Sequence, residues 1–156
     1  MDWFLTQCSQ LLKCRHINLK DDQSYLERYG LIRTRWLNAY LHKFVGSDDE
    51  HEGFHDHPFA WHCSLILFGS YIEMLPVGWQ QRAQFSFVRF DAYHKHRVVL
   101  REGTHVWTLF WHGPRVKGWG FFKGENYVEM SASSTDTVIA DGQWNNAKRK
   151  LWRKND

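Results

Sequence analysis

Long apolar runs and paired cysteines are both missing from this sequence of 156 residues. Its uninterrupted apolar runs are short, such as residues 65–68, so no segment is predicted to span a membrane as a helix. The first residues, MDWFLTQCSQLL, show no basic stretch and no small-residue cleavage site, which predicts no signal peptide. The three cysteines, Cys8, Cys14 and Cys63, form neither a CxxC pair nor an even disulfide set. We therefore expect a protein of the reducing cytoplasm.

A large excess of one charge sign is also missing, because 20 Lys and Arg side chains nearly balance 17 Asp and Glu side chains. The net charge of +3 is mostly local, since the segment KRKLWRK, residues 148–154, carries five cations. Such a run is most often a solvated terminal helix, and contact with nucleic acid or an acidic partner is the alternative. We expect neither nucleic acid nor a membrane as the main partner.

Aromatic residues, in contrast, are abundant: they make up 17% of the chain, with nine Trp and eleven Phe. Large flat side chains suit packed sheets or a ligand cavity. From residue 31 onward, strand-like runs alternate with Gly or Pro punctuation at a spacing of roughly 8–12 residues, which indicates a sandwich or barrel. The runs LILF and VWTLFW are apolar on both faces, so we expect these strands to be covered on both sides. All the predicted strands lie in RTRWLNAYLHKF, WHCSLILF, SYIEML, AQFSFVRF, HRVVL, HVWTLFWH and KGWGFF.

The sequence therefore predicts an all-β fold, an antiparallel double sheet with a helical decoration at its front. No repeat, proline-rich linker or low-complexity block divides the chain, which predicts a single domain over residues 1–156. We place its core at about residues 30–130. Residues 1–29 are predicted to form a helical N-terminal extension, with a helical turn over Asp21–Tyr29. Residues 131–156 are a C-terminal extension.

Histidines crowd into the stretch FHDHPFAWH, residues 54–62. Because residues i and i+2 of a strand project to one face, His55 and His57 aim at a common point, as two ligands of a metal must. His62 has the wrong parity for an unbroken strand, but Pro58 permits a bend that would reset the alternation. Asp56 points the other way, so we expect it to make a turn or supporting hydrogen bond rather than to ligate.

A second pair of histidines follows in DAYHKHRVVL. A strand returning beside the first could bring His94 or His96 to the same metal. We prefer His96, because it directly precedes the apolar run that begins at Val98, and keep His94 in reserve. On a neighbouring strand, Glu73 could orient a ligating histidine by accepting its other N–H.

These motifs resemble those of the cupin superfamily. The first cupin motif is HxH, three or four residues, Glu, six residues and Gly. Here His55 and His57 are followed by four residues, His62, six residues and Gly69, so His62 stands where the family usually has Glu. The stretch of about residues 30–122 also resembles small cupin-like proteins common in bacteria and phages. The PxG before the second-motif His is missing, as is the Asn four residues after it.

The resemblance implies a cupin-type double-stranded β-helix, the jelly-roll barrel, with His55, His57, His96 and His62 around one divalent transition metal. Fe(II) is favoured, with Zn, Mn or Ni as alternatives. The function implied is that of a metal-dependent, His-ligated dioxygenase. The alternatives are a Zn or Mn isomerase or hydrolase, and a non-catalytic binding or structural module. Cupins often pair, so a homodimer is compatible with the chain.

An ion held only by imidazoles keeps its full charge, so we expect a small, anionic ligand. Arginines on strands could meet that anion through their paired N–H groups. Aromatic side chains could line the cavity around it. The candidates for these roles are Arg33, Arg35, Arg89, Trp36, Tyr40 and Trp107.

Overall fold

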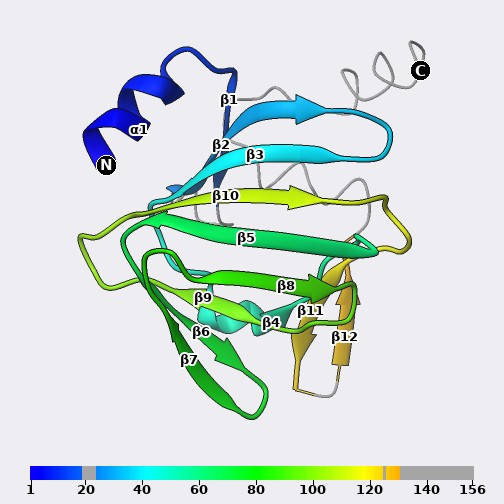
Figure 1. Ribbon diagram of the computed structural model, residues 1–156. Helices are drawn as coiled ribbons and strands as arrows, with labels where there is room; N and C mark the ends of the chain where they lie inside the picture. Colours follow the sequence, from blue (N-terminus) through cyan, green and yellow to red (C-terminus); the bar gives the residue numbers. More distant parts are fainter. Residues whose placement is uncertain (19–23, 125, 131–156) are drawn as a thin grey trace.

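Strands dominate the protein, and they form two facing layers with one short helix outside them (Figure 1). The computed structural model describes residues 1–18, 24–124 and 126–130. In chain order, the elements are α1 (Asp2–Ser9), β1 (Cys14–Asn18), β2 (Ser24–Arg33), β3 (Asn38–Phe44), the 3₁₀ helix η1 (Glu50–Glu52), β4 (Phe54–His55), β5 (Trp61–Phe68), β6 (Tyr71–Leu75), β7 (Gly78–Arg82), β8 (Phe87–Asp91), β9 (Arg97–Val99), β10 (Val106–His112), β11 (Gly120–Lys123) and β12 (Asn126–Glu129).

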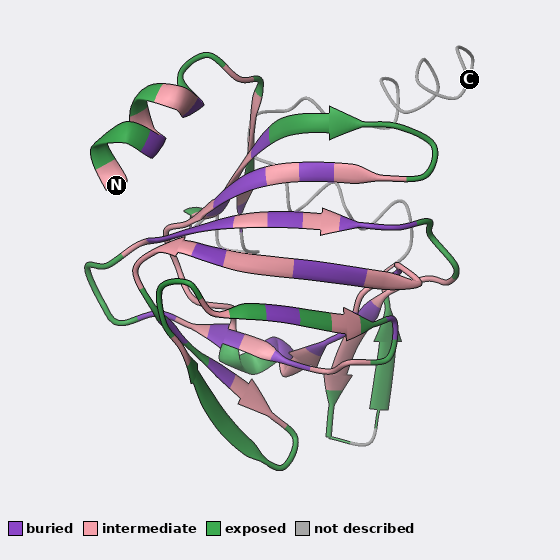
Figure 2. Ribbon diagram, viewed as in Figure 1, coloured by how far each residue is buried: buried purple, intermediate pink, exposed green. Residues whose placement is uncertain are grey.

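The larger layer is a six-stranded antiparallel sheet in the order β1-β2-β3-β10-β5-β8. Its central strand, β10, lies between β3 and β5 and is covered on both faces, as its apolar composition predicts. Val106 and Trp107 are adjacent and point to opposite faces, yet both are 0% exposed. Along the neighbouring strands, Figure 2 shows buried residues alternating with half-buried ones.

The facing layer consists of two three-stranded sheets, β7-β6-β9 and β12-β11-β4. Tyr71 and Val98 from this layer pack against Ile66 and Val106 of the six-stranded sheet in a buried apolar cluster. The two small sheets are joined by an isolated antiparallel bridge between His55 and His96. The antiparallel double sheet predicted from the sequence is thus confirmed.

The outer face of the six-stranded sheet is partly covered by α1. Leu5 is buried in a cluster that contains Trp107, which removes both apolar side chains from water. One carboxylate oxygen of Asp2 accepts hydrogen bonds from His105 Nε2 at 2.8 Å and from Trp107 Nε1 at 2.7 Å. A helix in the N-terminal extension is therefore confirmed, and it spans Asp2–Ser9.

The helical turn expected over Asp21–Tyr29 is wrong. The described part of that segment belongs to β2, which begins at Ser24 and pairs with β1 on one side and β3 on the other. Leu26, Glu27 and Arg28 are good helix formers, but two flanking strands satisfy their backbone groups and override that local preference. The sheet therefore begins at Cys14, well before residue 30, and the N-terminal extension is only partly helical.

Two further observations concern sequence predictions about the whole chain. The basic segment of residues 148–154 lies outside the described residues. Within the described residues, no helix has the length and apolar character needed to cross a membrane.

Candidate metal centre

His55, His57 and His96 converge at the junction of the two small sheets. His55 ends β4, His57 follows it by two residues, and His96 immediately precedes β9. The backbones of His55 and His96 exchange two hydrogen bonds, of 2.9 and 3.0 Å, which hold these residues side by side. One ring nitrogen from each of the three histidines lies within 4.8 Å of the others. The two histidines of the HxH pair and the histidine before the returning strand therefore lie together, as the sequence predicts.

The closest approach in this group is 2.9 Å, between the Nε2 atoms of His57 and His96. In the metal-free protein this contact is a hydrogen bond, and the network assigns its proton to His57. The reason is that His96 uses its Nδ1 proton toward Glu73, which leaves its Nε2 as the acceptor. With metal–nitrogen distances of about 2.0–2.1 Å, two nitrogens at right angles around one ion are also about 2.9 Å apart. The spacing therefore fits two neighbouring ligands of a single metal.

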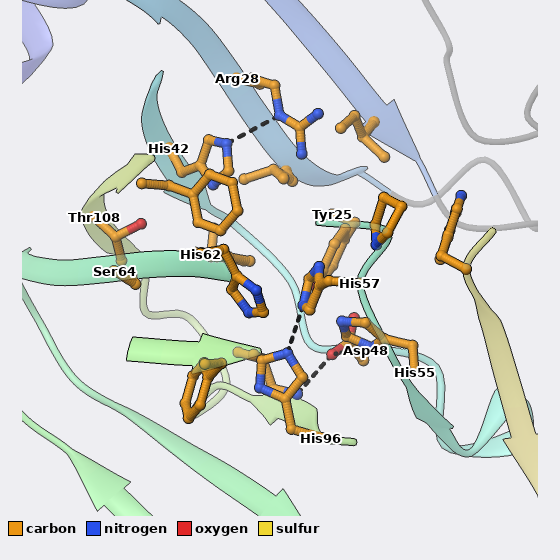
Figure 3. Close-up of a pocket in the computed structure, with 18 of the residues that line it drawn as sticks. Tyr25, Arg28, His42, Asp48, His55, His57, His62, Ser64, His96 and Thr108 are labelled. Carbon is orange, nitrogen blue, oxygen red and sulfur yellow. Dashed lines mark hydrogen bonds and ion pairs between the residues drawn. The ribbon is translucent and has the colours of Figure 1, made fainter. Parts of the chain in front are cut away.

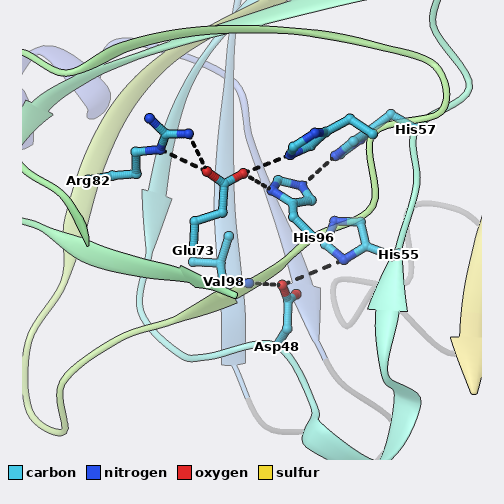
Figure 4. A network of polar contacts seen from close by, with 8 residues as sticks. Asp48, His55, His57, Glu73, Arg82, His96 and Val98 are labelled. Atoms are coloured by element: carbon cyan, nitrogen blue, oxygen red, sulfur yellow. Dashed lines mark hydrogen bonds and ion pairs between the residues drawn. The ribbon is translucent and has the colours of Figure 1, made fainter. Parts of the chain in front are cut away.

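Glu73 fixes the orientation of His96 from behind (Figure 4). This carboxylate on β6 is 0% exposed. Its Oε1 accepts from His96 Nδ1 at 2.8 Å and from His94 Nε2 at 3.0 Å, and its Oε2 accepts from Arg82 Nε at 2.7 Å. Burial alone would raise the pKa of Glu73, but the three donors outweigh it and hold the pKa below its ordinary value. The ionised carboxylate keeps the Nε2 of His96 directed toward His57, the supporting role predicted for Glu73.

A second carboxylate, Asp48, lies behind His55 but beyond hydrogen-bond distance. Its Oδ2 accepts the backbone N–H of Val98 at 2.6 Å and lies 3.6 Å from Nδ1 of His55. Figure 4 shows this carboxylate on the side of His55 away from His57. Within the described residues no carboxylate pairs with the Nε2 of His55, which is therefore available as a ligand. Sequence reasoning missed Asp48, because it lies in a connection whose position only the fold determines.

His62 enters the same site from the six-stranded sheet. The chain leaves β4 at His55, bends through Pro58 and resumes as β5 at Trp61, which turns His62 inward. Its ring centroid is 4.2 Å from that of His57. His62 is 1% exposed, and neither of its ring nitrogens has a hydrogen-bond partner in the described structure. A buried imidazole with two unsatisfied nitrogens is costly, and an ion beside it would satisfy one of them.

Burial keeps these imidazoles neutral. Desolvation lowers the pKa of His55 to about 4 and that of His62 to about 3. The pKa of His57 is lowered by burial and then by the neighbouring histidines. All three rings therefore offer lone pairs at neutral pH, which is the form that binds metal.

The histidines open onto a cavity of about 380 Å³ between the two layers. Figure 3 shows His55, His57 and His96 at one end of the space and the Arg28–His42 pair at the other, with His62 between them. The remaining wall is mostly apolar and aromatic. Members of that wall include Phe44, Phe59, Tyr71, Phe90, Phe110, Trp119 and Phe121. A cavity of this size and lining suits a small organic ligand with few polar groups.

Three residues expected near the site lie elsewhere. Trp36 is 68% exposed in the turn before β3 and stacks with Arg35, so its predicted place on the cavity wall is wrong. Arg89 is exposed and does not line the cavity, because its neighbours Val88 and Phe90 take the inward positions of β8. Trp107 packs under α1 on the opposite face of the sheet.

Two other predicted residues take supporting positions. Tyr40 lies behind the wall, with its ring 5.9 Å from the rings of both His42 and His112. His94 stacks on Phe90 at 3.7 Å and contacts Glu73, and it belongs with Glu73 and His96 to a second group of potential ligands rather than to that of His55, His57 and His96.

Asp56 also takes a supporting position. It accepts a hydrogen bond from the backbone N–H of Gly120 at 2.9 Å and pairs with Lys117, as expected for a residue that points away from the metal.

Comparison with known sequences gives one partial match. No family model matches the chain. Among curated proteins, a MATH domain and coiled-coil domain-containing protein of Arabidopsis thaliana is 25% identical over 122 residues. That match covers 78% of this chain but 35% of the relative, so the chain spans about a third of that protein's length.

Solved structures give a more complete overlap. The polyketide cyclase RemF of Streptomyces resistomycificus matches with a TM-score of 0.60 at 15% identity, over 75% of this chain and 84% of that one. A sugar phosphate isomerase of the cupin superfamily from Silicibacter pomeroyi matches with a TM-score of 0.59 at 13% identity, over 84% and 87%. The chain has a cupin-like fold. In this fold the HxH motif and His96 lie side by side at the ends of neighbouring strands, through the backbone bridge between His55 and His96.

Proposed function

We propose that this cupin-like protein is a metal-dependent enzyme that holds one divalent transition metal on His55, His57, His96 and His62 and acts on a small anionic molecule. The supporting observation is the convergence of imidazoles on the wall of an aromatic cavity, with both nitrogens of buried His62 unsatisfied within the described residues. A donor set made only of imidazole nitrogens suits Fe, Zn, Ni or Cu better than Mg or Ca.

The residues around the ion would prepare the site in three ways. Glu73 holds the back of His96 through a hydrogen bond, so that its ligand atom is oriented before the metal arrives, and Asp48 places a negative charge near His55. The aromatic wall limits water near the substrate and strengthens electrostatic contacts there. Four nitrogens around a six-coordinate ion would leave two positions for other ligands, and the cavity provides the space beside them.

The specific reaction that we propose is oxygenation by Fe(II). When bound, iron would supply the electrons that O₂ chemistry requires, and the two remaining positions would admit O₂ and one donor atom of the substrate. The chain's own contribution would be to orient that substrate and to keep water out. The three free thiols suit the reducing cytoplasm in which Fe(II) persists.

A second candidate is a redox-neutral reaction on Zn or Mn, such as an isomerisation or a hydrolysis. It is favoured by the neutral ligand set, because four imidazoles leave the ion its full positive charge for polarising a carbonyl or lowering the pKa of bound water. The two structural neighbours named above, a cyclase and an isomerase, are compatible with this alternative.

The deciding experiment is metal analysis of the purified protein beside two variants. His57→Ala removes a proposed ligand, and His51→Ala removes an exposed histidine as a matched control. Near-stoichiometric metal in the wild type and in His51→Ala, lost in His57→Ala, is the expected result. Iron would direct the next assay to oxygen uptake, and zinc or manganese to oxygen-independent turnover. Absence of bound metal in all three proteins, even after reloading with each ion, would refute the proposal.

A further inference from the structure

A second polar group lies on the wall of the same cavity, away from the four histidines. Arg28 on β2 and His42 on β3 are directly paired in the sheet register. The guanidinium donates from Nε to Nε2 of His42 at 2.9 Å and lies over the ring of Tyr40 at 5.2 Å. Figure 3 shows the remaining guanidinium nitrogens of Arg28 directed into the cavity.

Arg28 has no acidic partner within the described ranges, although acidic side chains line part of the same cavity. Those acids are engaged elsewhere. Asp48 accepts from the backbone of Val98 and from the hydroxyl of Tyr25. Asp49 accepts from the backbone of residue 51, and Glu52 lies 3.5 Å from Lys123. The half-buried Arg28 cation therefore lacks the nearby counter-charge that buried charges normally have.

We propose that Arg28 and His42 form a carboxylate-binding subsite that anchors the substrate at the end of the cavity away from the metal. The unused N–H groups of Arg28 can take a carboxylate through two parallel hydrogen bonds. His42 accepts from Arg28 at Nε2, so its remaining proton is on Nδ1, where it is available as a further donor. The desolvation that lowers the pKa of Arg28 would be offset by an anion bound beside it.

The charge of the subsite favours a carboxylate over a phosphate group. Arg28 supplies one positive charge, which balances one carboxylate but leaves a phosphate dianion undercompensated in a dry cavity. His42 cannot add a second charge at neutral pH, because burial and then the nearby Arg28 cation hold its pKa well below the ordinary value. The subsite therefore selects a monoanion.

The position of Phe110 limits the size and shape of the ligand between the two polar groups. Its ring stacks on His42 with centroids 4.9 Å apart, and the same ring lies 5.8 Å from His62 and 6.4 Å from His57. One aromatic side chain therefore spans the interval between the subsite and the histidine cluster. A compact, flat acid, such as an arylcarboxylate, matches this interval and the apolar wall. This substrate class rests on the proposed function, while the subsite itself does not require the metal.

The test measures binding of 4-fluorobenzoate and of its neutral isostere 4-fluorobenzamide by fluorine NMR, in metal-stripped and zinc-loaded full-length protein. Arg28→Gln should weaken 4-fluorobenzoate binding by about 10- to 100-fold in both states, since a charge-assisted pair is lost. Its effect on the benzamide should be small. Arg89→Gln, which removes an exposed arginine outside the cavity, should change neither affinity.

The failures of the two proposals are distinguishable. If no metal is held but Arg28→Gln still weakens the carboxylate, the subsite stands and the metal proposal falls. If wild type does not bind 4-fluorobenzoate, or if Arg28→Gln binds it as wild type does while zinc content is normal, the subsite is refuted. Circular dichroism checks the fold. Should Arg28→Gln fail to fold, Arg28→Lys, which keeps the charge but loses the paired N–H geometry, should still weaken the carboxylate several-fold.

Discussion

Removing the charge of Glu73 should damage both stability and metal binding, and the two effects can be separated. The carboxylate is fully buried between Arg82 on one side and His94 and His96 on the other. In Glu73→Gln the side chain keeps its size, but an amide has one acceptor oxygen, and its NH₂ group must face donors. Arg82 is then left as a buried cation without a counter-charge.

Breaking a buried pair in this way costs about 3–5 kcal/mol. For a chain of this length, each kcal/mol shifts Tm by about 2–4 °C, so Glu73→Gln should melt roughly 10 °C below the wild type. The affinity for zinc should fall by about 10- to 100-fold, because Glu73 no longer orients the ring of His96. Urea denaturation of the metal-stripped protein measures the first effect, and competition with a zinc chelator measures the second.

Two further variants make this reasoning refutable. Glu102→Gln removes an exposed carboxylate and should leave both quantities unchanged. Glu73→Gln combined with Arg82→Met removes the unpaired cation as well, so stability should partly recover while zinc affinity stays low. If Glu73→Gln unfolds at the same urea concentration as Glu102→Gln, the buried pair is not the stabilising element that the structure indicates. If the double variant regains zinc affinity, Glu73 does not act through His96.

Three other perturbations test the histidines and the helix. In metal-stripped protein, the free energy of unfolding should decrease as the pH falls from about 6.5 toward 4. The histidines take up protons at their ordinary pKa of 6.5 when unfolded, but His55 does so at about 4 in the fold, a linkage on the order of 3 kcal/mol. Urea titrations at successive pH values measure it, and a flat profile would contradict it. His62→Phe should stabilise the stripped protein by about 1 kcal/mol, since it removes two unsatisfied nitrogens, while lowering zinc retention. A loss of stability in that melt would argue against the orphaned imidazole. Asp2→Ala should cost about 1 kcal/mol in urea denaturation by releasing α1 from His105, with metal content unchanged.

Much of the architecture follows from local pattern. The strand runs, the break at Pro58 and the convergence of His55, His57 and His96 follow from the period of two along a strand and from the bend that proline permits. The preference for His96 over His94 also agrees with the geometry, since His96 is grouped with His55 and His57, whereas His94 is grouped with Glu73 and His96 alone. The resemblance to cupins fixed the register of these motifs more tightly than the alternation alone could.

Other features could not be read in this way. Residues 24–29 have local helix-forming character, yet β1 and β3 on either side make them a strand. This strand in turn delivers Arg28 to the cavity, where sequence analysis had considered only Arg33, Arg35 and Arg89. Trp36 continues the alternation of β3 in the sequence, but the strand begins at Asn38, and the residue lies in solvent.

The sequence by itself determined which side chains could form a metal site, because ligand chemistry and the i, i+2 spacing are local properties. Tertiary structure decided what surrounds them: the carboxylates behind His55 and His96, the unsatisfied ring of His62, and the arginine at the far end of the cavity. These depend on how separate strands and loops come together, as when Glu73 meets His96 at a separation of 23 positions. Burial, and with it the neutral state of the imidazoles, arises only when the two layers close over the site.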